Sequence, residues 1–411
     1  MNPLRLVFAG LRQHAGSSAL AAAAVALAVA LMLAVTALRE EAQRQFTQTG
    51  QGVDAVLGPK GSPLQIVLNA LHHLEEMPGR IPWTIYQEVR ADPVVADGFA
   101  FISGHSYAGF RVNAVEARFL SDFRYRAEQH FTFAAGRAFA RRGEAVAGAE
   151  AARALGLELG RSFDPVCGMK EGDPVHADDR ITFVGVLAPT GTAHDRAIYI
   201  PLEAFYTLEG HGSEVAAMAD DLAKREISGA YLRLARIRAG AFHPGVQILR
   251  HALGQEPRAQ LVLPAEVMPR LFAIIGWVDA LLLAVGALVA VLAGAFLAFA
   301  LVATLRERQR DLALLRALGA GRRTIFGLVL AQAQAIGLVG ALAGWILGRA
   351  LIWLGCQAIA AETGLRLDPW RWSVADTWLL PTACALAVLA GLWPAIQTYR
   401  IALHDALKPS A

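Results

Sequence analysis

Four long runs of apolar residues dominate the chain. They cover residues 15–38, 271–305, 324–348 and 377–399, and only Asp279 interrupts the second run. An α-helix rises about 1.5 Å per residue, so each run is long enough to cross a hydrocarbon core about 30 Å thick. The pattern predicts an integral membrane α-helical protein with four transmembrane helices.

The region between the first two runs has the mixed composition of a globular domain. Short β-type runs alternate there with stretches of helical apolar spacing, which predicts a large extracytoplasmic α/β domain over residues 50–268. We expect a glycine-rich loop at 50–61, helices at 63–76, 201–222 and 244–253, strands at 99–102, 110–115, 181–187, 198–200 and 227–237, and a strand followed by a helix at 144–157.

Helical spacing extends beyond the first two apolar runs. Residues 1–14 carry an apolar stripe that predicts an amphipathic helix at the membrane surface. Good helix formers at 39–48 and the length of the region 269–305 predict that spans 1 and 2 continue outward as a stalk. Asp279 then lies at or above the interface; the alternative is a functional carboxylate within the membrane.

Arginine and lysine near the span ends indicate the orientation. They occur in the amino-terminal tail, in the loop 306–323 and in the tail 400–411. Such residues stay on the cytoplasmic side, so both termini are expected in the cytoplasm and the protein in the inner membrane. Span 3 is then expected at 324–356, a short outer loop at 357–376 and span 4 at 377–399. This asymmetry accounts for the net charge of +3, which gives no support to nucleic-acid binding.

Recognised catalytic and nucleotide-binding motifs are absent from the sequence. It has no G-x-x-x-x-G-K-[ST] loop, no G-x-S-x-G elbow, no H-E-x-x-H and no C-x-x-C pair. We therefore expect no catalytic residues, no bound cofactor and no nucleotide hydrolysis by this chain. The composition, 55% hydrophobic and 18% charged, agrees with a membrane protein.

Histidines are concentrated in the outer region, where nine of the eleven occur. His176, Asp178 and Asp179 lie close in sequence and are candidate metal ligands. Because their spacing matches no known ligand pattern, scattered surface histidines are the favoured interpretation.

Two further patterns suggest contacts with other helices or proteins. Within the loop 306–323, leucines interleave with charges and Gly319 ends the helical pattern, which is typical of a short docking helix; the alternative is a topology marker only. In span 3, Gly340, Gly344 and Gly348 form a small-xxx-small stripe that allows close helix packing.

Three segments resemble one protein family. Residues 307–325, ERQRDLALLRALGAGRRTI, resemble the E-R-x-R-E-I-x-L-L-R-A-L-G-A-x-R-x-x-I signature of FtsX-like permeases, the membrane subunits of MacB, LolC/LolE and FtsX-type ABC systems. The tail 394–408 is similar to the family's ending, and residues 144–160 resemble the MacB-type periplasmic domain. Gln332, Asp311 and Leu403 depart from the usual residues.

The resemblance implies the permease subunit of an ABC transporter. It implies a homodimer or a pair with a sister permease, bound to a cytoplasmic ATPase that holds ATP and magnesium. Membrane lipid is a further partner, and a periplasmic protein is a candidate partner. Energy would pass outward by mechanotransmission, on a lipophilic, peptide or lipoprotein cargo. The residues implied in coupling to the ATPase are Arg310, Asp311, Leu314, Leu315, Arg316, Leu318, Gly319 and Arg323.

Other functions stay open at the level of the sequence. One is a cargo-free, ATP-driven regulator of a periplasmic partner, as FtsX-type subunits are. Another is a zinc-linked transport component, because residues 56–65 and 184–192 resemble a subgroup associated with metal-linked operons. A membrane sensor or an enzyme with a catalytic outer domain is the weakest, since the catalytic motifs are absent.

We predict that Arg316→Glu uncouples the protein from its ATPase and leaves membrane insertion intact, because charge reversal opposes a complementary contact. Co-purification of the ATPase and stimulation of its activity are the measurements. If both are unchanged in the variant, the docking assignment is wrong.

Overall fold

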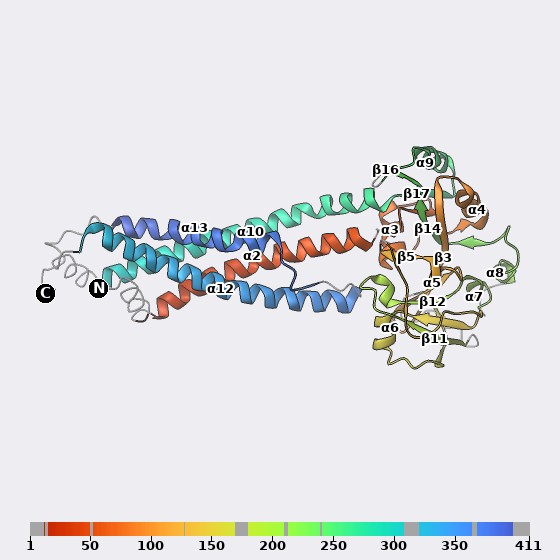
Figure 1. Ribbon diagram of the computed structural model, residues 1–411, viewed down its shortest axis with the longest axis horizontal. Coiled ribbons are helices and arrows are strands. Elements are labelled where there is room, and N and C mark those ends of the chain that lie inside the picture. Colours follow the sequence, from red (N-terminus) through yellow and green to blue (C-terminus); the bar gives the residue numbers. More distant parts are fainter. Residues whose placement is uncertain are drawn as a thin grey trace. The chain divides into compact units, whose positions relative to one another are not determined.

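A computed structural model describes residues 12, 15–49, 52–126, 128–168, 180–208, 213–238, 241–307, 320–363 and 368–397 (Figure 1). The chain divides into two compact units, which are considered separately. The membrane unit contains Met1–Ala42, Ile275–Ala358 and Asp368–Ala411, and the α/β unit contains Gln43–Ile274 and Ile359–Leu367. The amphipathic helix predicted at the amino terminus lies outside the described residues.

Among the described residues, four helices are long and apolar enough to cross a membrane, which confirms the prediction of four spans. They are α2 (Ala15–Thr49), α10 (Pro264–Glu307), α12 (Arg322–Thr363) and α13 (Val374–Gln397). At 35 and 44 residues, α2 and α10 exceed the roughly 20 residues that a bilayer requires, so helix continues beyond the predicted spans. The helix α12 continues to Thr363, beyond the predicted end of span 3 at residue 356. The side chain of Asp279 lies outside the described part.

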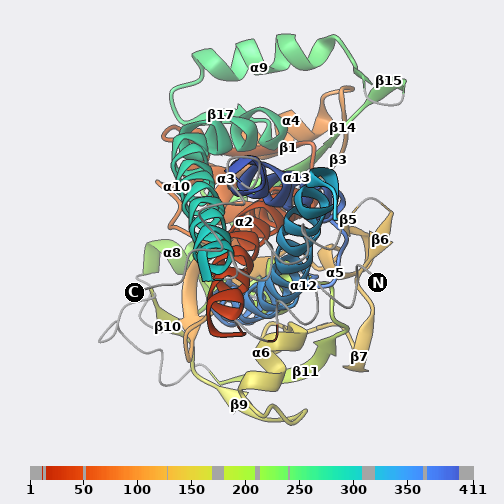
Figure 2. The ribbon, with the colours of Figure 1, turned by 90° about the vertical axis from the view of Figure 1, so that its left-hand side faces the viewer.

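The four membrane helices share a small core and expose their remaining apolar surface. Figure 2 views them nearly end-on, with α2 between α10 and α12. One core cluster takes buried side chains from every helix: Ala21, Leu297, Leu301, Ala333, Ile336 and Ala387. Outward-facing residues such as Leu288, Val339 and Leu389 are large, apolar and exposed. This distribution suits helices that contact one another on one side and lipid on the other.

The α/β unit is built on one mixed sheet. The strands run in the order β17-β1-β14-β3-β4-β12-β8-β11-β7, with β10 beside β3 and β9 beside β11. The pairs β4/β12 and β8/β11 are parallel, and the other pairs of this sheet are antiparallel. The strands are β1 (Ala55–Pro59), β3 (Val95–Tyr107), β4 (Phe110–Val115), β7 (Phe133–Gly136), β8 (Glu144–Ala147), β9 (Ser162–Phe163), β10 (Val166–Cys167), β11 (Ile181–Leu187), β12 (Ala197–Pro201), β14 (Gly229–Leu234) and β17 (Ala259–Val262).

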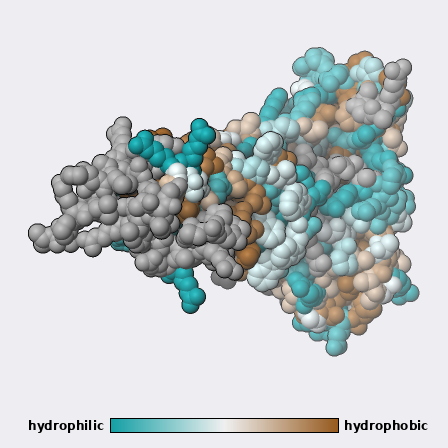
Figure 3. Space-filling model, turned by 60° about the vertical axis from the view of Figure 1, so that its left-hand side comes forward, coloured by the Kyte–Doolittle hydropathy of each residue, from teal (hydrophilic) through white to brown (hydrophobic). Residues whose placement is uncertain are grey.

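The surface of this unit is mostly hydrophilic or weakly polar, with smaller hydrophobic patches (Figure 3). Short ladders and helices complete the unit. Three two-stranded ladders pair β2 (Ile81–Pro82) with β13 (Glu226–Ile227), β5 (Arg124–Arg126) with β6 (Gln129–His130), and β15 (Arg236–Arg238) with β16 (Ala241–Phe242). The helices are α3 (Pro63–His72), α4 (Trp83–Ala91), α5 (Phe119–Asp122), α6 (Ala149–Ala154), η1 (Ala193–Arg196), α7 (Leu202–Tyr206), α8 (Ser213–Ala217) and α9 (Gly245–Gln255).

Both faces of the sheet are covered by apolar side chains. Helices α4, α6, α7 and α9 contribute to one hydrophobic core, and α3 and α5 contribute to a second. Strand β1 divides between them, because Leu57 belongs to the first core and Val56 to the second. A strand buried on both faces has no polar alternation, which is the usual sequence signal of a strand.

The sequence predicted strands of both kinds, those with alternating burial and those buried on both faces. The runs at 110–115 and 181–187 are confirmed as β4 and β11 with the expected bounds. The loop expected at 50–61 was wrong, because it contains the fully buried β1, whose Gly58 and Pro59 resemble loop residues. The single strand expected at 227–237 is instead divided among β13, β14 and β15, and the helix expected at 201–222 among α7 and α8.

Two buried histidines, His72 and His194, and the half-buried His73 lie around the end of α3. The rings of His73 and His194 meet edge to face with centroids 5.3 Å apart, and the His194 Nδ1 lies 2.5 Å from the Tyr199 hydroxyl. Burial lowers the pKa of His72 to about 4, and burial with the nearby Arg111 charge lowers the pKa of His73 to about 3. Burial likewise holds the pKa of His194 well below its usual value.

The lowered pKa values of these histidines predict that the α/β unit loses stability in acid. The unfolded chain takes up protons near pH 6.5, whereas the folded unit resists them until a much lower pH. Each histidine therefore removes up to about 1.4 kcal/mol of stability per pH unit as the pH falls from 6.5 towards its folded pKa. Hydrogen-exchange protection factors of β3 and β4 measure this loss.

The His73→Asn variant should reduce the pH dependence, since asparagine tolerates the left-handed backbone of His73, at φ 53°. The exposed His130 provides the control, and His130→Gln should leave the dependence unchanged. Equal protection at pH 6.5 and pH 4.5 in the unaltered protein would contradict the prediction.

Candidate functional site

The predicted coupling residues lie almost entirely outside the described part of the chain. This applies to Arg310, Asp311, Leu314, Leu315, Arg316, Leu318 and Gly319. Arg323 is described and is an exposed residue in the first turn of α12. The Gly321 carbonyl accepts hydrogen bonds from Thr324 N at 3.0 Å and Ile325 N at 3.3 Å, so α12 begins directly after the loop.

The glycine stripe of α12 lies directly against α2. A Cβ atom added at Gly340 would lie 2.8 Å from the Ala22 carbonyl oxygen, and one added at Gly344 would lie 2.6 Å from that of Ala26. At Gly348 the added atom would meet the Leu33 side chain at 3.0 Å and the Ala30 backbone at 3.3 Å. These separations leave no room for a side chain on α12 along this line.

On α2 the glycine stripe meets alanine backbone and the side chains of Val25 and Val29. Ala22, Ala26 and Ala30 recur at every fourth residue and face Gly340, Gly344 and Gly348 in the same order. The glycines were predicted from the sequence as a packing stripe, whereas the alanines that face them were not. Alanine is too frequent in the first span for its period to stand out there.

Other glycine contacts join the remaining neighbours of the bundle. Gly337 of α12 approaches Ala387 of α13, and Gly294 of α10 approaches Leu386 of α13. Gly286 of α10 approaches Met32 of α2. Within the membrane unit, close backbone contacts therefore link α2 to α12, α12 to α13, α13 to α10, and α10 to α2.

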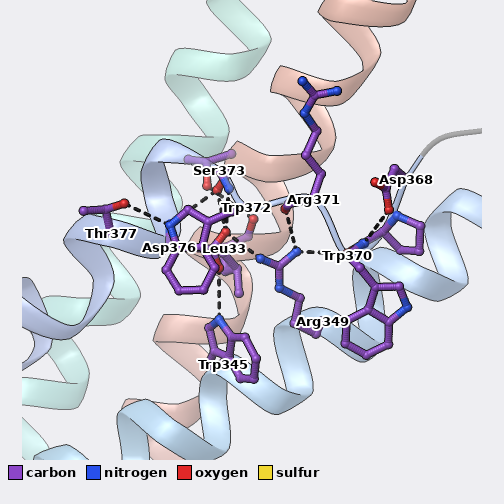
Figure 4. Close-up of polar contacts among 12 residues, drawn as sticks. Leu33, Trp345, Arg349, Asp368, Trp370, Arg371, Trp372, Ser373, Asp376 and Thr377 are labelled. Carbon is purple, nitrogen blue, oxygen red and sulfur yellow. Dashed lines mark hydrogen bonds and ion pairs between the residues drawn. The ribbon is translucent and has the colours of Figure 1, made fainter.

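A buried ion pair joins α12 and α13 just beyond the glycine stripe (Figure 4). The Arg349 Nη2 donates to the Asp376 Oδ2 at 2.6 Å, and the two side chains are 4% and 0% exposed. Arg349 also donates from Nη1 to the carbonyls of Pro369 at 2.9 Å and Arg371 at 3.0 Å. Arg349 thereby fastens the chain before α13 to α12.

Asp376 is satisfied by several donors besides Arg349. Trp345 Nε1 donates to its Oδ1 at 2.9 Å, and Ser373 donates to its Oδ2 from the backbone N at 2.8 Å and the hydroxyl at 3.0 Å. Buried ions are tolerated when such additional hydrogen bonds compensate for their desolvation. We name Arg349 and Asp376 with these partners the polar clamp.

The polar clamp was not predicted from the sequence. The third apolar run ends at Gly348, one residue before Arg349, and Asp376 was expected in an outer loop. A usable signal was present, because one arginine and one aspartate stand at the same end of two consecutive spans.

An apolar cavity of about 300 Å³ lies between α2, α10 and α13. Its walls are alanine, valine, leucine and methionine side chains, with Thr36, Thr382 and Trp378 as the polar-tipped exceptions. Such a lining suits hydrocarbon and offers no charge for a polar solute.

The structure gives no support to a metal centre in the described part of the chain. No group of three or more histidine, cysteine, aspartate or glutamate side chains is placed there to hold a metal ion. His176, Asp178 and Asp179 fall in the stretch 169–179, outside the described residues.

These features define an integral membrane protein with an α/β domain inserted between its first two spans. The FtsX-like permease C-terminal family matches residues 283–403, and the MacB-like periplasmic core domain matches residues 18–233, more than half of the chain. The chain belongs to the FtsX/MacB-like family of ABC transporter permeases.

Two solved structures are similar to part of the chain. The periplasmic region of MacB from Actinobacillus actinomycetemcomitans is 9% identical, with a TM-score of 0.35, and the match covers 55% of this chain and 97% of that one. The extracellular domain of the ABC-type transporter YknZ from Gram-positive bacteria is 12% identical, with a TM-score of 0.30, covering 50% and 98%. No curated protein matches the chain.

The close approach of α12 to α2 predicts that adding one methyl group at a contacting glycine destabilises the membrane unit. Gly344→Ala should destabilise the membrane unit by about 1–3 kcal/mol, because its Cβ overlaps a backbone oxygen of α2. Gly327→Ala on the same helix is the matched control, since its Cβ meets nothing within 4 Å. Thermal unfolding in detergent compares the two, and equal midpoints would show that the contact is absent.

Proposed function

We propose that this chain is the membrane subunit of an inner-membrane ABC system, with both termini cytoplasmic. It receives the energy of ATP hydrolysis from a separate ATPase and transmits it to the outer domain by movement of its helices. The family assignment supports the permease role. The absence of a phosphate-binding loop from the sequence supports hydrolysis by a partner, which would hold ATP and magnesium.

The contact between α12 and α2 is the observation that carries this proposal. The segment 306–323 joins α10, which ends at Glu307, to α12, which begins at Arg322, so a push on the segment acts on both helices. Because Gly340, Gly344 and Gly348 approach the α2 backbone so closely, a displacement of α12 towards α2 pushes α2 as well. In turn α2 leads along the chain to β1 of the α/β unit.

The bundle explains how a movement at one helix is shared. Glycine contacts also connect α12 to α13, α13 to α10 and α10 to α2. Close contacts of this kind transmit displacement, because atoms already in contact have no space between them to absorb it. A homodimer, or a pair with a sister permease, would double this arrangement around two ATPase subunits.

The proposal is tested with the cognate ATPase in lipid nanodiscs. ATP with vanadate should change hydrogen exchange in the α/β unit of the unaltered complex. Gly344→Ala should reduce that change by more than half while the ATPase stays bound, since the tight contact with α2 is disturbed. Gly327→Ala should respond as the unaltered complex does. An α/β unit that ignores nucleotide in every form would refute mechanical transmission.

The apolar cavity favours a second candidate, in which a lipophilic part of the cargo enters between the spans. Ala290 lines this cavity, so Ala290→Phe would fill part of it. With a diacylated lipopeptide as the probe, this candidate requires that Ala290→Phe abolish stimulation of the ATPase and leave the nucleotide-dependent exchange intact. Unchanged stimulation by the probe would exclude entry through the cavity.

A further inference from the structure

Three large side chains stand out of the membrane unit beside the polar clamp. Trp370 is 69% exposed, Trp372 is 64% exposed, and Arg371 between them is exposed as well. Trp378, at the start of α13, is 62% exposed. Exposed tryptophans at a span end are typical of the membrane–water interface, where the ring contacts apolar material and the indole N–H contacts water or headgroups.

The distance along α12 places these residues at the depth of the lipid headgroups. Counted along α12 at about 1.5 Å per residue, Arg349 lies roughly 40 Å from Arg322. The hydrocarbon core is about 30 Å thick, and about 40–45 Å with its headgroup layers. The candidate span of α13 begins at Asp376. The polar clamp and the residues beside it therefore belong to the headgroup layer at the membrane face away from Arg322.

The segment that carries these side chains has a fixed backbone. Arg349 holds the carbonyls of Pro369 and Arg371, and Asp376 holds the backbone N–H of Ser373. The Asp368 carboxylate accepts from the Trp370 backbone N at 3.0 Å, and Trp372 Nε1 donates to the Thr377 hydroxyl at 3.1 Å. Each residue from 368 to 373 therefore either forms one of these hydrogen bonds or is next to a residue that does.

The side chain of Arg371 points away from the polar clamp. Figure 4 shows it extending from the opposite side of the backbone to the Arg349 guanidinium. Within residues 320–363 and 368–397, no carboxylate forms an ion pair with Arg371. An exposed guanidinium at headgroup depth complements a phosphate, which it binds through a planar fork of N–H donors.

We propose that Trp370, Arg371 and Trp372 form a binding site for an anionic phospholipid headgroup, in which Arg371 contacts the phosphate and the two indoles lie at the interface. Arg349 and Asp376 are the positioning residues of this site, because they fix the backbone that presents it. A desolvated ion pair contributes little net stability, whereas it imposes one geometry on the chain around it. Lipid binding would set the depth of α12 and α13 in the bilayer.

Native mass spectrometry of the full-length protein in detergent tests the site. Dioleoylphosphatidylglycerol is the probe, and dioleoylglycerol is the same lipid without phosphate. We expect the phospholipid to bind more tightly than dioleoylglycerol, and Arg371→Gln to weaken it about fivefold, as expected for one cation lost near an anionic headgroup. Arg371→Lys should retain most of the binding.

Arg258→Gln is the matched control, because Arg258 is an exposed arginine of the α/β unit and the charge change is the same. It should bind the phospholipid as the unaltered protein does. Equal binding of both lipids, no loss in Arg371→Gln, or the same loss in Arg258→Gln would each overturn the proposal. A change of oligomeric state in Arg371→Gln with lipid binding unchanged would also overturn it, because the surface would then contact a second copy.

Asp376→Asn tests the positioning role separately. Asparagine keeps the shape of the side chain and removes its charge, so the hold of Arg349 on the segment weakens. Phosphatidylglycerol binding should fall while dioleoylglycerol binding stays constant. Retention of full phospholipid affinity in this variant would show that the polar clamp does not position the site, and Arg371→Gln would still decide whether the site exists.

Discussion

The close approach of α12 to α2 is the constraint on which the membrane unit depends. Between helices in lipid, apolar surface gives no net drive to associate, so contact must come from dense packing and hydrogen bonds. Gly340 and Gly344 bring their helix within contact distance of backbone oxygens on α2, beside the side chains of Val25 and Val29. The position of α12 then limits where α13 and α10 can pack, because each neighbouring pair in the bundle is joined by a further glycine contact.

Polar interactions complement that packing at one end of the bundle. Arg349 follows the last glycine of the stripe directly and reaches Asp376 at 2.6 Å, with both side chains almost fully enclosed. Van der Waals contact along the helices tolerates small shifts, whereas a hydrogen-bonded ion pair is directional. The glycine stripe therefore determines which faces meet, and the polar clamp determines the register and the path of the chain entering α13.

The α/β unit depends on a different balance. Its sheet is covered on both faces, so strand β1 alternates between two apolar cores and contributes no polar face. The same enclosure keeps His72, His73 and His194 out of water and lowers their pKa values. Burial therefore supports this unit near neutral pH and weakens it in acid.

The sequence alone was sufficient for the four spans, the inserted α/β domain and the family, because span length, apolar composition and the motif at 307–325 are local properties. It predicted β4 and β11, yet it missed β1, since Gly58 and Pro59 of that strand resemble loop residues. It identified Gly340, Gly344 and Gly348 as a packing stripe without naming the helix that meets it. Only the tertiary structure placed Ala22 and Ala26 against those glycines and Arg349 against Asp376. Such pairs join residues far apart in the chain, and their meeting depends on how whole helices pack.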